Sequence, residues 1–262
     1  MLTTLISPTS GNLHILGIDA LKNPIEIRKK IGVVLQQPSY EPSLSVERAL
    51  DTYGMMWNVP RRLRRERTDE LLAEFDLQDL RKKNMDDLSI GQRRRVQVAR
   101  EFMHDMELLF LDEPTVGLDP TARRALLDSL RTKVREGMTI LYTTHILSEV
   151  EYICDEIAII NRGKIAEVST PENLKLKFGK EKTITVHISP MEDIALLLVD
   201  VAGCKVGIDA VTILPPGAEA TLLRVLDILH SNNVPIRDLS VESINLEDVF
   251  LRVVSESDAP AG

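Results

Sequence analysis

The pattern of apolar and polar positions divides the chain into stretches of different character. Short apolar runs between turns predict strands at Leu13–Gly17 and Ile31–Leu35, and the second run is typical of a buried parallel strand. Between Val46 and Arg100, apolar residues recur at helical spacing, as in the helix expected directly after Pro60. We therefore expect a strand-containing start followed by a helical region.

Strands and helices alternate from residue 107 to residue 178. The strands are expected at Leu108–Leu111, Thr139–Thr143 and Glu156–Ile160, with helices at 121–135 and 146–154 between them. A turn at 161–163 follows the third strand. This alternation predicts parallel βαβ units and an α/β sheet.

The last 80 or so residues change character. They predict an exposed strand at Thr183–Ile188, a turn at Pro215–Gly217, a helix at Thr221–Leu229 and a polar tail from Ser255. We place a domain boundary near Gly179. The expected organisation is an α/β domain over 1–179 with a helical subdomain at about 46–100, a small α+β domain over 180–255, and a tail over 256–262.

Composition and charge narrow the class of protein. The 262 residues are 44% hydrophobic and carry a net charge of −8, which excludes a disordered chain and one whose whole surface binds nucleic acid. The apolar stretch Ile194–Val199 is far shorter than the ~20 residues of a membrane span. The first residues lack the features of a signal peptide. Cys154 and Cys204 match no zinc-ligand spacing and are interpreted as reduced core thiols. The chain is expected to be cytoplasmic.

An arginine-rich segment, 61–65, opens one of the expected helices. It is interpreted either as a solvated helix face, with Glu66 and Asp69 as partners, or as a contact for an acidic partner or lipid headgroups.

The first candidate site lies where an apolar strand ends in two carboxylates, Asp112 and Glu113. Parallel sheets bind ligands at this edge. Asp112 suits a Mg²⁺ ion held partly through water, and Glu113 could accept a proton from an attacking water. The alternative is a strand that ends in a solvated acidic turn. His145 closes the next strand and would lie at the same edge.

A second candidate site lies upstream, where Ser89, Gly91 and Gln92 precede a basic helix. Such a loop offers backbone N–H groups, a hydroxyl and the positive end of a helix, which together favour phosphate. The alternative is an ordinary turn that caps the helix. Downstream, Asp119 lies in a turn before another helix.

These motifs together resemble the ATP-binding subunits of ABC transporters. Leu88–Gln92 is similar to the signature loop, with Ile90 where a second glycine is more usual. Leu108–Glu113 resembles the Walker B strand, Val116–Asp119 the D-loop, His145 the switch histidine and Gln36 the Q-loop glutamine. The motifs follow the family's order, and the resemblance covers about residues 1–179. The segment 244–251 is similar to the C-terminal extension of drug-exporter ATPases.

The resemblance implies a P-loop NTPase-like core with a helical subdomain, ATP and Mg²⁺ as cofactors, and no nucleic-acid partner. Two copies would enclose two ATP molecules, with Ser89, Gly91 and Gln92 of one copy facing the γ-phosphate held by the other. Glu113 would polarise the attacking water and His145 would stabilise the transferring phosphate. Asp112 and Gln36 would hold the metal, and Asp119 would communicate across the homodimer.

The resemblance also implies a membrane permease as partner. A set of large apolar residues would form the groove for it, or else a local core of the helical subdomain: Tyr40, Leu44, Tyr53, Met55, Met56 and Trp57. The protein would then lie on the cytoplasmic face of the membrane. It would power an exporter of drug-like or lipid-like compounds. Two alternatives are an ATPase acting on ribosomes or DNA, which the single motif set disfavours, and a non-hydrolytic regulatory or interaction module.

The chain contains no G-x-x-x-x-G-K-[ST] motif; the pairs Gly163-Lys164 and Gly179-Lys180 are followed by the wrong residues. By the resemblance, the chain is truncated at its N-terminus. It would lack its first βα unit of roughly 30 or more residues, including a strand beside Asp112. We expect the chain as written to bind ATP weakly or not at all and to aggregate.

Overall fold

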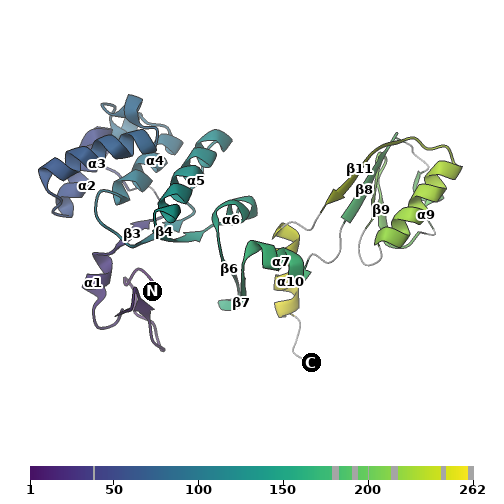
Figure 1. Ribbon diagram of the computed structural model, residues 1–262, viewed down its shortest axis with the longest axis horizontal. Coiled ribbons are helices and arrows are strands. Elements are labelled where there is room, and N and C mark those ends of the chain that lie inside the picture. The colour runs from purple at the N-terminus through teal and green to yellow at the C-terminus, as the bar shows by residue number, and fades with distance from the viewer. Residues whose placement is uncertain are drawn as a thin grey trace. The chain divides into compact units, whose positions relative to one another are not determined.

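The computed structural model describes residues 1–37, 39–178, 183–190, 194–199, 201–213, 218–242 and 246–258 (Figure 1). The chain divides into two compact units, Met1–Ile146 and Leu147–Gly262. Among the described residues, no helix is both long and apolar enough to cross a membrane.

The first unit is built on a parallel sheet. Strands β3 (Ile31–Val34), β4 (Leu108–Asp112) and β5 (Thr139–Thr143) run in the order β3-β4-β5. The predicted parallel α/β sheet is therefore confirmed. Both neighbours of β4 are present, so the expectation of a further strand directly beside Asp112 is wrong. Asp112 is in register with Thr143, so the two strands end at one edge.

The N-terminal segment forms a hairpin rather than the expected strand at 13–17. Strands β1 (His14–Ile15) and β2 (Ile18–Asp19) pair antiparallel. Between them, Leu16 and Gly17 both have positive φ, at 53° and 76°. Two positive φ angles in a row make a tight hairpin turn whose twist matches that of the strands. Helix α1 (Pro24–Arg28) follows and packs on β2 and β3.

The predicted helical region is present. Helices α2 (Val46–Met56), α3 (Arg61–Glu74) and α4 (Ile90–Glu101) pack together (Figure 1). Short 3-10 turns, η1 (Gln78–Leu80) and η2 (Met85–Asp87), link α3 to α4. Helix α3 begins directly after Pro60, whose ring favours a helix start. Helix α5 (Pro120–Arg135) follows β4 and buries Leu126, Leu127 and Leu130.

In the second unit, helix α6 (Leu147–Ile153) precedes a hairpin of β6 (Ile157–Asn161) and β7 (Lys164–Ser169). The strand predicted at 156–160 is present, but its expected place in parallel βαβ units is wrong, because β6 pairs antiparallel with β7. Arg162 and Gly163 have φ of 48° and 76°, again the geometry of a tight hairpin turn. Helix α7 (Pro171–Phe178) follows β7.

The C-terminal helix α10 (Leu246–Asp258) packs on the segment from α6 to α7. Buried Leu246, Val249 and Val253 share one hydrophobic cluster with Val150 and Leu174. This division of the chain after Ile146 differs from the boundary placed near Gly179, because the apolar face of α10 is covered by residues before that boundary. The helix also continues to Asp258, past the start of the expected tail at Ser255.

Residues between α7 and α10 form an α+β fold with its own core. The order is β8 (Thr183–Ile188), α8 (Ile194–Leu197), β9 (Cys204–Val206), β10 (Ala210–Ile213), α9 (Ala218–Ser231) and β11 (Ile236–Glu242). The antiparallel sheet has the strand order β11-β8-β10-β9. This βαββαβ order is the ferredoxin-like arrangement. Val186, Val211 and Val225 are fully buried in its core.

The two cysteines and the turn expected at 215–217 belong to this second unit. Cys154 and Cys204 are free thiols, each half-buried, and burial raises the pKa of Cys154 to about 11. The turn expected at Pro215–Gly217 lies outside the described residues, as does Gly179 itself.

Candidate functional site

The carboxyl ends of β4 and β5 bring the first candidate residues together. The hydroxyl of Thr143 donates a hydrogen bond of 2.6 Å to Oδ1 of Asp112. The backbone N–H of Glu113 donates to the carbonyl of Thr143 at 3.0 Å. This backbone bond belongs to the parallel pairing of Asp112 with Thr143, and it sets where the Glu113 side chain starts.

Glu113 and His145 form a pair at this edge. Nδ1 of His145 lies 2.8 Å from Oε1 of Glu113 and 2.7 Å from Oε2. Glu113 has a φ of 47°, a left-handed conformation that is uncommon for a residue with a side chain. Such backbone strain persists only where neighbouring contacts enforce it, and it clusters at functional sites. The sheet edge thus holds a constrained carboxylate against an imidazole.

The second candidate loop starts helix α4. The Ser89 hydroxyl oxygen accepts from the backbone N–H of Gln92 at 3.2 Å, and the Gln92 side-chain oxygen accepts from the N–H of Ser89 at 3.0 Å. This reciprocal arrangement is a capping box. It uses the Gln92 oxygen within the loop and leaves the hydroxyl proton of Ser89 able to donate.

The turn before α5 packs against the start of α4. Asp119 caps α5 by accepting from the N–H groups of Thr121 and Ala122, both at 3.0 Å. These hydrogen bonds, that of Ala122 first, lower the pKa of Asp119. A Cβ added to Gly117 would lie 3.1 Å from Cγ2 of Ile90. One added to Gly91 would lie equally close to a Leu118 methyl, so the two loops are in van der Waals contact.

Sequence reasoning missed Arg94, the most connected side chain of the site. It lies on α4 and is only 4% exposed. Its guanidinium donates to the carbonyls of Asp112, Glu113 and Pro114, each at 2.9 Å. It also reaches the carbonyl of Leu35 at 2.6 Å and that of Gln36 at 3.5 Å. In the sequence it is one of several arginines on a basic helix, and no signal there sets it apart.

Gln36 follows β3 and is exposed, so its side chain is open to solvent at the same end of the sheet as Asp112. The candidate residues therefore form two groups. Gln36, Asp112, Glu113 and His145 lie at the sheet edge. Ser89, Gly91, Gln92 and Asp119 lie at the N-termini of α4 and α5.

The sheet edge suits a Mg²⁺ ion that accompanies a nucleotide. Asp112 is exposed there and offers carboxylate oxygen, and the Gln36 amide offers a further oxygen. Within the described part of the chain, no cluster of three or more His, Cys, Asp or Glu could hold a metal ion by itself. Magnesium at nucleotide sites uses only one or two protein ligands and completes its shell with phosphates and water. The oxygens of Asp112 and Gln36 are therefore enough protein ligands for such an ion.

The residues expected to form either a groove or a local core divide into two sets. Tyr40, Leu44, Tyr53 and Met56 line a cavity of about 130 Å³ between α2 and α4. Trp57 instead stacks on His104, with ring centroids 3.9 Å apart. Trp57 therefore belongs to the local core, as the alternative interpretation had it.

Comparison with known proteins agrees with this geometry. The family model described as "ABC transporter" matches residues 1–116. The daunorubicin resistance ATP-binding protein DrrA3 of Streptomyces coeruleorubidus is 30% identical over 259 residues, which cover 98% of this chain and 82% of that protein. The chain belongs to the ABC transporter ATP-binding protein family. The linearmycin resistance ATP-binding protein LnrL of Bacillus subtilis is 28% identical, over 98% of this chain and 85% of that protein.

Solved structures from this family share the fold. An ATP-binding subunit of an ABC transporter matches with a TM-score of 0.61 and 28% identity, over 68% of this chain and 74% of that one. CbiO1 from Clostridium perfringens, part of the ABC transporter complex CbiONQ, matches with a TM-score of 0.61 and 25% identity, over 76% of each chain. The α/β ABC ATPase fold expected from the sequence is confirmed.

Proposed function

We propose that the protein, in a form that carries the P-loop absent from these 262 residues, is the ATP-binding and ATP-hydrolysing subunit of an ABC exporter of drug-like or lipid-like compounds. The observation that carries this proposal is the Glu113–His145 pair beside Asp112 at the sheet edge. Relatives named for resistance to daunorubicin and linearmycin support the exporter class.

In the proposed mechanism, the Glu113 carboxylate accepts a hydrogen bond from the attacking water and aligns it with the γ-phosphate. His145 holds that carboxylate through Nδ1 and presents the rest of its exposed ring to the phosphate. Asp112 and Gln36 would hold Mg²⁺, which neutralises phosphate charge when bound. Positioning and electrostatics supply most of the rate enhancement in phosphoryl transfer.

The α4 loop would act on nucleotide held by a second copy of the chain. Ser89 can donate its hydroxyl proton, and the first N–H groups of α4 together with the helix dipole favour an anion. Gln92 would support this loop by closing its capping box, and Asp119 would support it through the turn that contacts Ile90. The working form would be a homodimer.

The partner would be a separate membrane permease. The cavity between α2 and α4 is mostly apolar and is lined by Tyr40, Tyr53 and Met56, which suits an apolar side chain presented by a short helix of that subunit. CbiO1 is described as part of a transporter complex, which supports an assembly of this kind. The protein would then lie on the cytoplasmic face of the cell membrane.

The test is ATP hydrolysis by the protein assembled with its membrane partner in nanodiscs. Glu113→Gln should lower kcat at least about 100-fold while ATP binding persists. The matched control is Glu107→Gln, because Glu107 is an exposed partner of Lys30 away from the sheet edge. Equal hydrolysis by the wild type and Glu113→Gln would contradict the assignment.

A second candidate is a non-hydrolytic regulatory or interaction module derived from an ABC ATPase. The absence of a G-x-x-x-x-G-K-[ST] motif from these 262 residues favours it. In this case the wild type would neither bind nor hydrolyse ATP in the same assay, yet would still assemble with the permease.

A further inference from the structure

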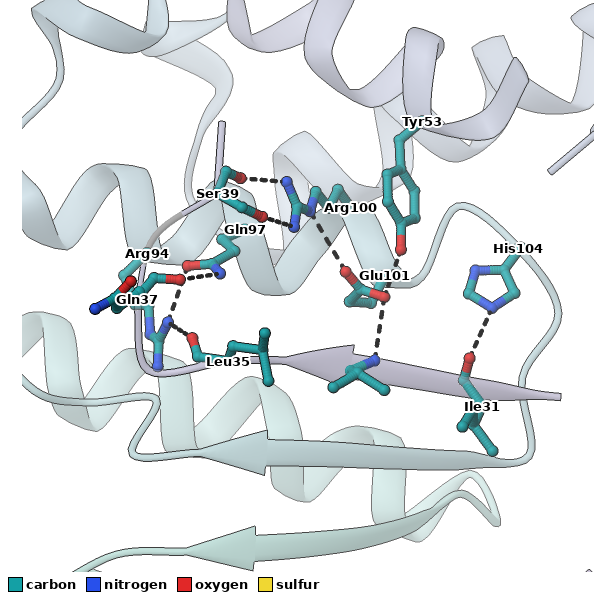
Figure 2. A network of polar contacts seen from close by, with 11 residues as sticks. Ile31, Leu35, Gln37, Ser39, Tyr53, Arg94, Gln97, Arg100, Glu101 and His104 are labelled. Atoms are coloured by element: carbon teal, nitrogen blue, oxygen red, sulfur yellow. Dashed lines mark hydrogen bonds and ion pairs between the residues drawn. The ribbon is translucent and has the colours of Figure 1, made fainter. Parts of the chain in front are cut away.

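Helix α4 lies along residues 31–37 and 39, which belong to β3 and the loop after it. Polar side chains of α4 and of the turn after it bind the backbone of these residues (Figure 2). The bonds are Arg94 to Leu35 and Gln36, Gln97 to Gln37, Arg100 to Ser39, Glu101 to Val33 and His104 to Ile31. These side chains recur every three or four residues, the spacing of one helix face. The described residues of the loop after β3, which are 35–37 and 39, are therefore attached to α4.

Arg94 differs from the others because it also binds a second segment. All three of its side-chain nitrogens donate. Nε and one terminal nitrogen bind the carbonyls of residues 112–114, and the other terminal nitrogen binds the loop after β3 and the Gln97 side chain. One buried cation thus joins two loops that are more than 70 residues apart in the sequence.

The chemistry of the guanidinium suits this task. It has five N–H donors in a rigid plane, so it can serve carbonyls on several sides at once. A lysine ammonium carries the same charge but only three donors on one atom, and it cannot span both loops. Hydrogen bonds to a buried charged group are also stronger than neutral ones.

We propose that Arg94 is a positioning residue for ATP hydrolysis, which fixes the backbone that carries Glu113 against the loop that carries Gln36. This inference rests on the proposed function. Arg94 binds the carbonyl of Glu113 itself, so it restrains the residue whose φ is 47°. It therefore acts on the carboxylate through the backbone, and it also connects the loop that carries Gln36 to helix α4, whose N-cap is Ser89.

The first test needs no nucleotide. Hydrogen exchange is measured on the full chain for peptides covering 33–37 and 112–118, in the wild type and in Arg94→Lys. We expect exchange at least about tenfold faster in both peptides of the variant. The matched control is Arg95→Lys, because Arg95 lies next along α4 and also binds backbone carbonyls, those of Phe75 and Asp76. The control should leave both peptides unchanged.

The second test measures steady-state ATP hydrolysis by the permease-bound protein. Arg94→Lys should lower kcat about tenfold or more and leave KM for ATP within about threefold, because alignment and not binding is lost. Arg95→Lys should lower the thermal stability by about as much as Arg94→Lys does. It should nevertheless leave kcat and KM unchanged. A purely structural role for Arg94 would instead make the two lysine variants alike.

The two proposals fail in different ways. Unchanged exchange at 33–37 and 112–118 in Arg94→Lys overturns the positioning role, whether or not ATP is hydrolysed. Wild-type kcat in Arg94→Lys, in a protein whose Glu113→Gln variant is inactive, also overturns it. A third outcome is that the wild type does not hydrolyse ATP while hydrogen exchange is still faster in Arg94→Lys. This result would contradict the proposed function, but it would support the connection that Arg94 makes between the two loops.

Discussion

Nδ1 of His145 lies within 2.8 Å of both carboxylate oxygens of Glu113. The Glu113 side chain is 21% exposed and that of His145 is 70% exposed. The carboxylate is thus shielded while the imidazole faces solvent. This asymmetry suits a pair in which Glu113 is held in a fixed position and the imidazole of His145 faces an incoming ligand.

The pair should behave as a unit in kinetics. His145→Ala should lower kcat for ATP hydrolysis by about 10²–10³-fold, because the carboxylate loses its partner and the phosphate loses a donor. Combined with Glu113→Gln, it should cost little more than Glu113→Gln alone, since groups acting together are not additive. His14→Ala, at an exposed histidine of the N-terminal hairpin, is the control. Multiplicative losses in the double variant would show that the two residues act independently.

The loop at the start of α4 has two roles that substitution can separate. Ser89→Ala should lower the free energy of unfolding by about 1 kcal/mol, because the N-cap acceptor is lost. Ser89→Asp should keep that stability, because aspartate is an equally good N-cap and favours the helix dipole. It should nevertheless reduce ATP hydrolysis, since its charge repels phosphate.

Urea unfolding and steady-state ATP hydrolysis, measured on both variants, check this pair of outcomes. Ser89→Thr is the control that keeps both the cap and the hydroxyl. Full hydrolysis by Ser89→Asp would mean that this loop does not face phosphate and serves only to begin the helix.

The sequence correctly predicted which residues lie at the edge of the parallel sheet. It did not correctly predict which strands pair with one another. The buried run at 108–111 and its two following carboxylates placed Asp112 and Glu113 correctly at the end of β4. The same kind of run predicted β6, but its antiparallel pairing with β7 depends on a tight turn at Arg162 and Gly163. An apolar run shows that a strand is buried and does not show which strand pairs with it.

Two further features could not be predicted from the pattern. Arg94 lies among four arginines of one helix, and only the folded backbone shows that it is buried while Arg93 and Arg95 bind other partners. The apolar face of α10 is visible in the sequence, but its partner Leu174 is more than 70 residues away. Long-range packing of this kind decides where a compact unit ends.

The contact between α7 and α10 should be needed for the stability of the segment 147–178. Leu174 is 1% exposed, so Leu174→Ala should cost about 2–4 kcal/mol through a buried cavity. Peptides from 147–178 and α10 should exchange hydrogen faster, while those from β8 and β10 stay unchanged because that sheet has its own core. Leu176→Ala is the control on the same helix, since Leu176 is 70% exposed. If these peptides exchange at the wild-type rate or more slowly in Leu174→Ala, the contact between α7 and α10 is not needed for the stability of 147–178.

The buried carboxyl of Glu101 predicts a pH dependence of stability. Its Oε2 accepts from the Tyr53 hydroxyl at 2.6 Å and from the Val33 N–H at 3.3 Å. Burial raises the pKa of Glu101 above its usual value of 4.5. The folded state therefore binds the proton more tightly than the unfolded state. The contribution of Glu101 to stability is full below pH 4.5 and is lost as pH rises through the folded-state pKa.

Glu101→Gln removes this titration and keeps an oxygen for Tyr53 and Val33. The variant should therefore gain stability relative to the wild type as pH rises from 4.5 to 8. Burial lowers the pKa of nearby His104, which makes stability fall at acidic pH, but that effect is common to both proteins and cancels in their difference. Urea unfolding followed by the fluorescence of Trp57, the chain's single tryptophan, measures the difference at each pH. A difference that stays constant across this range would show that Glu101 keeps its usual pKa in the folded protein.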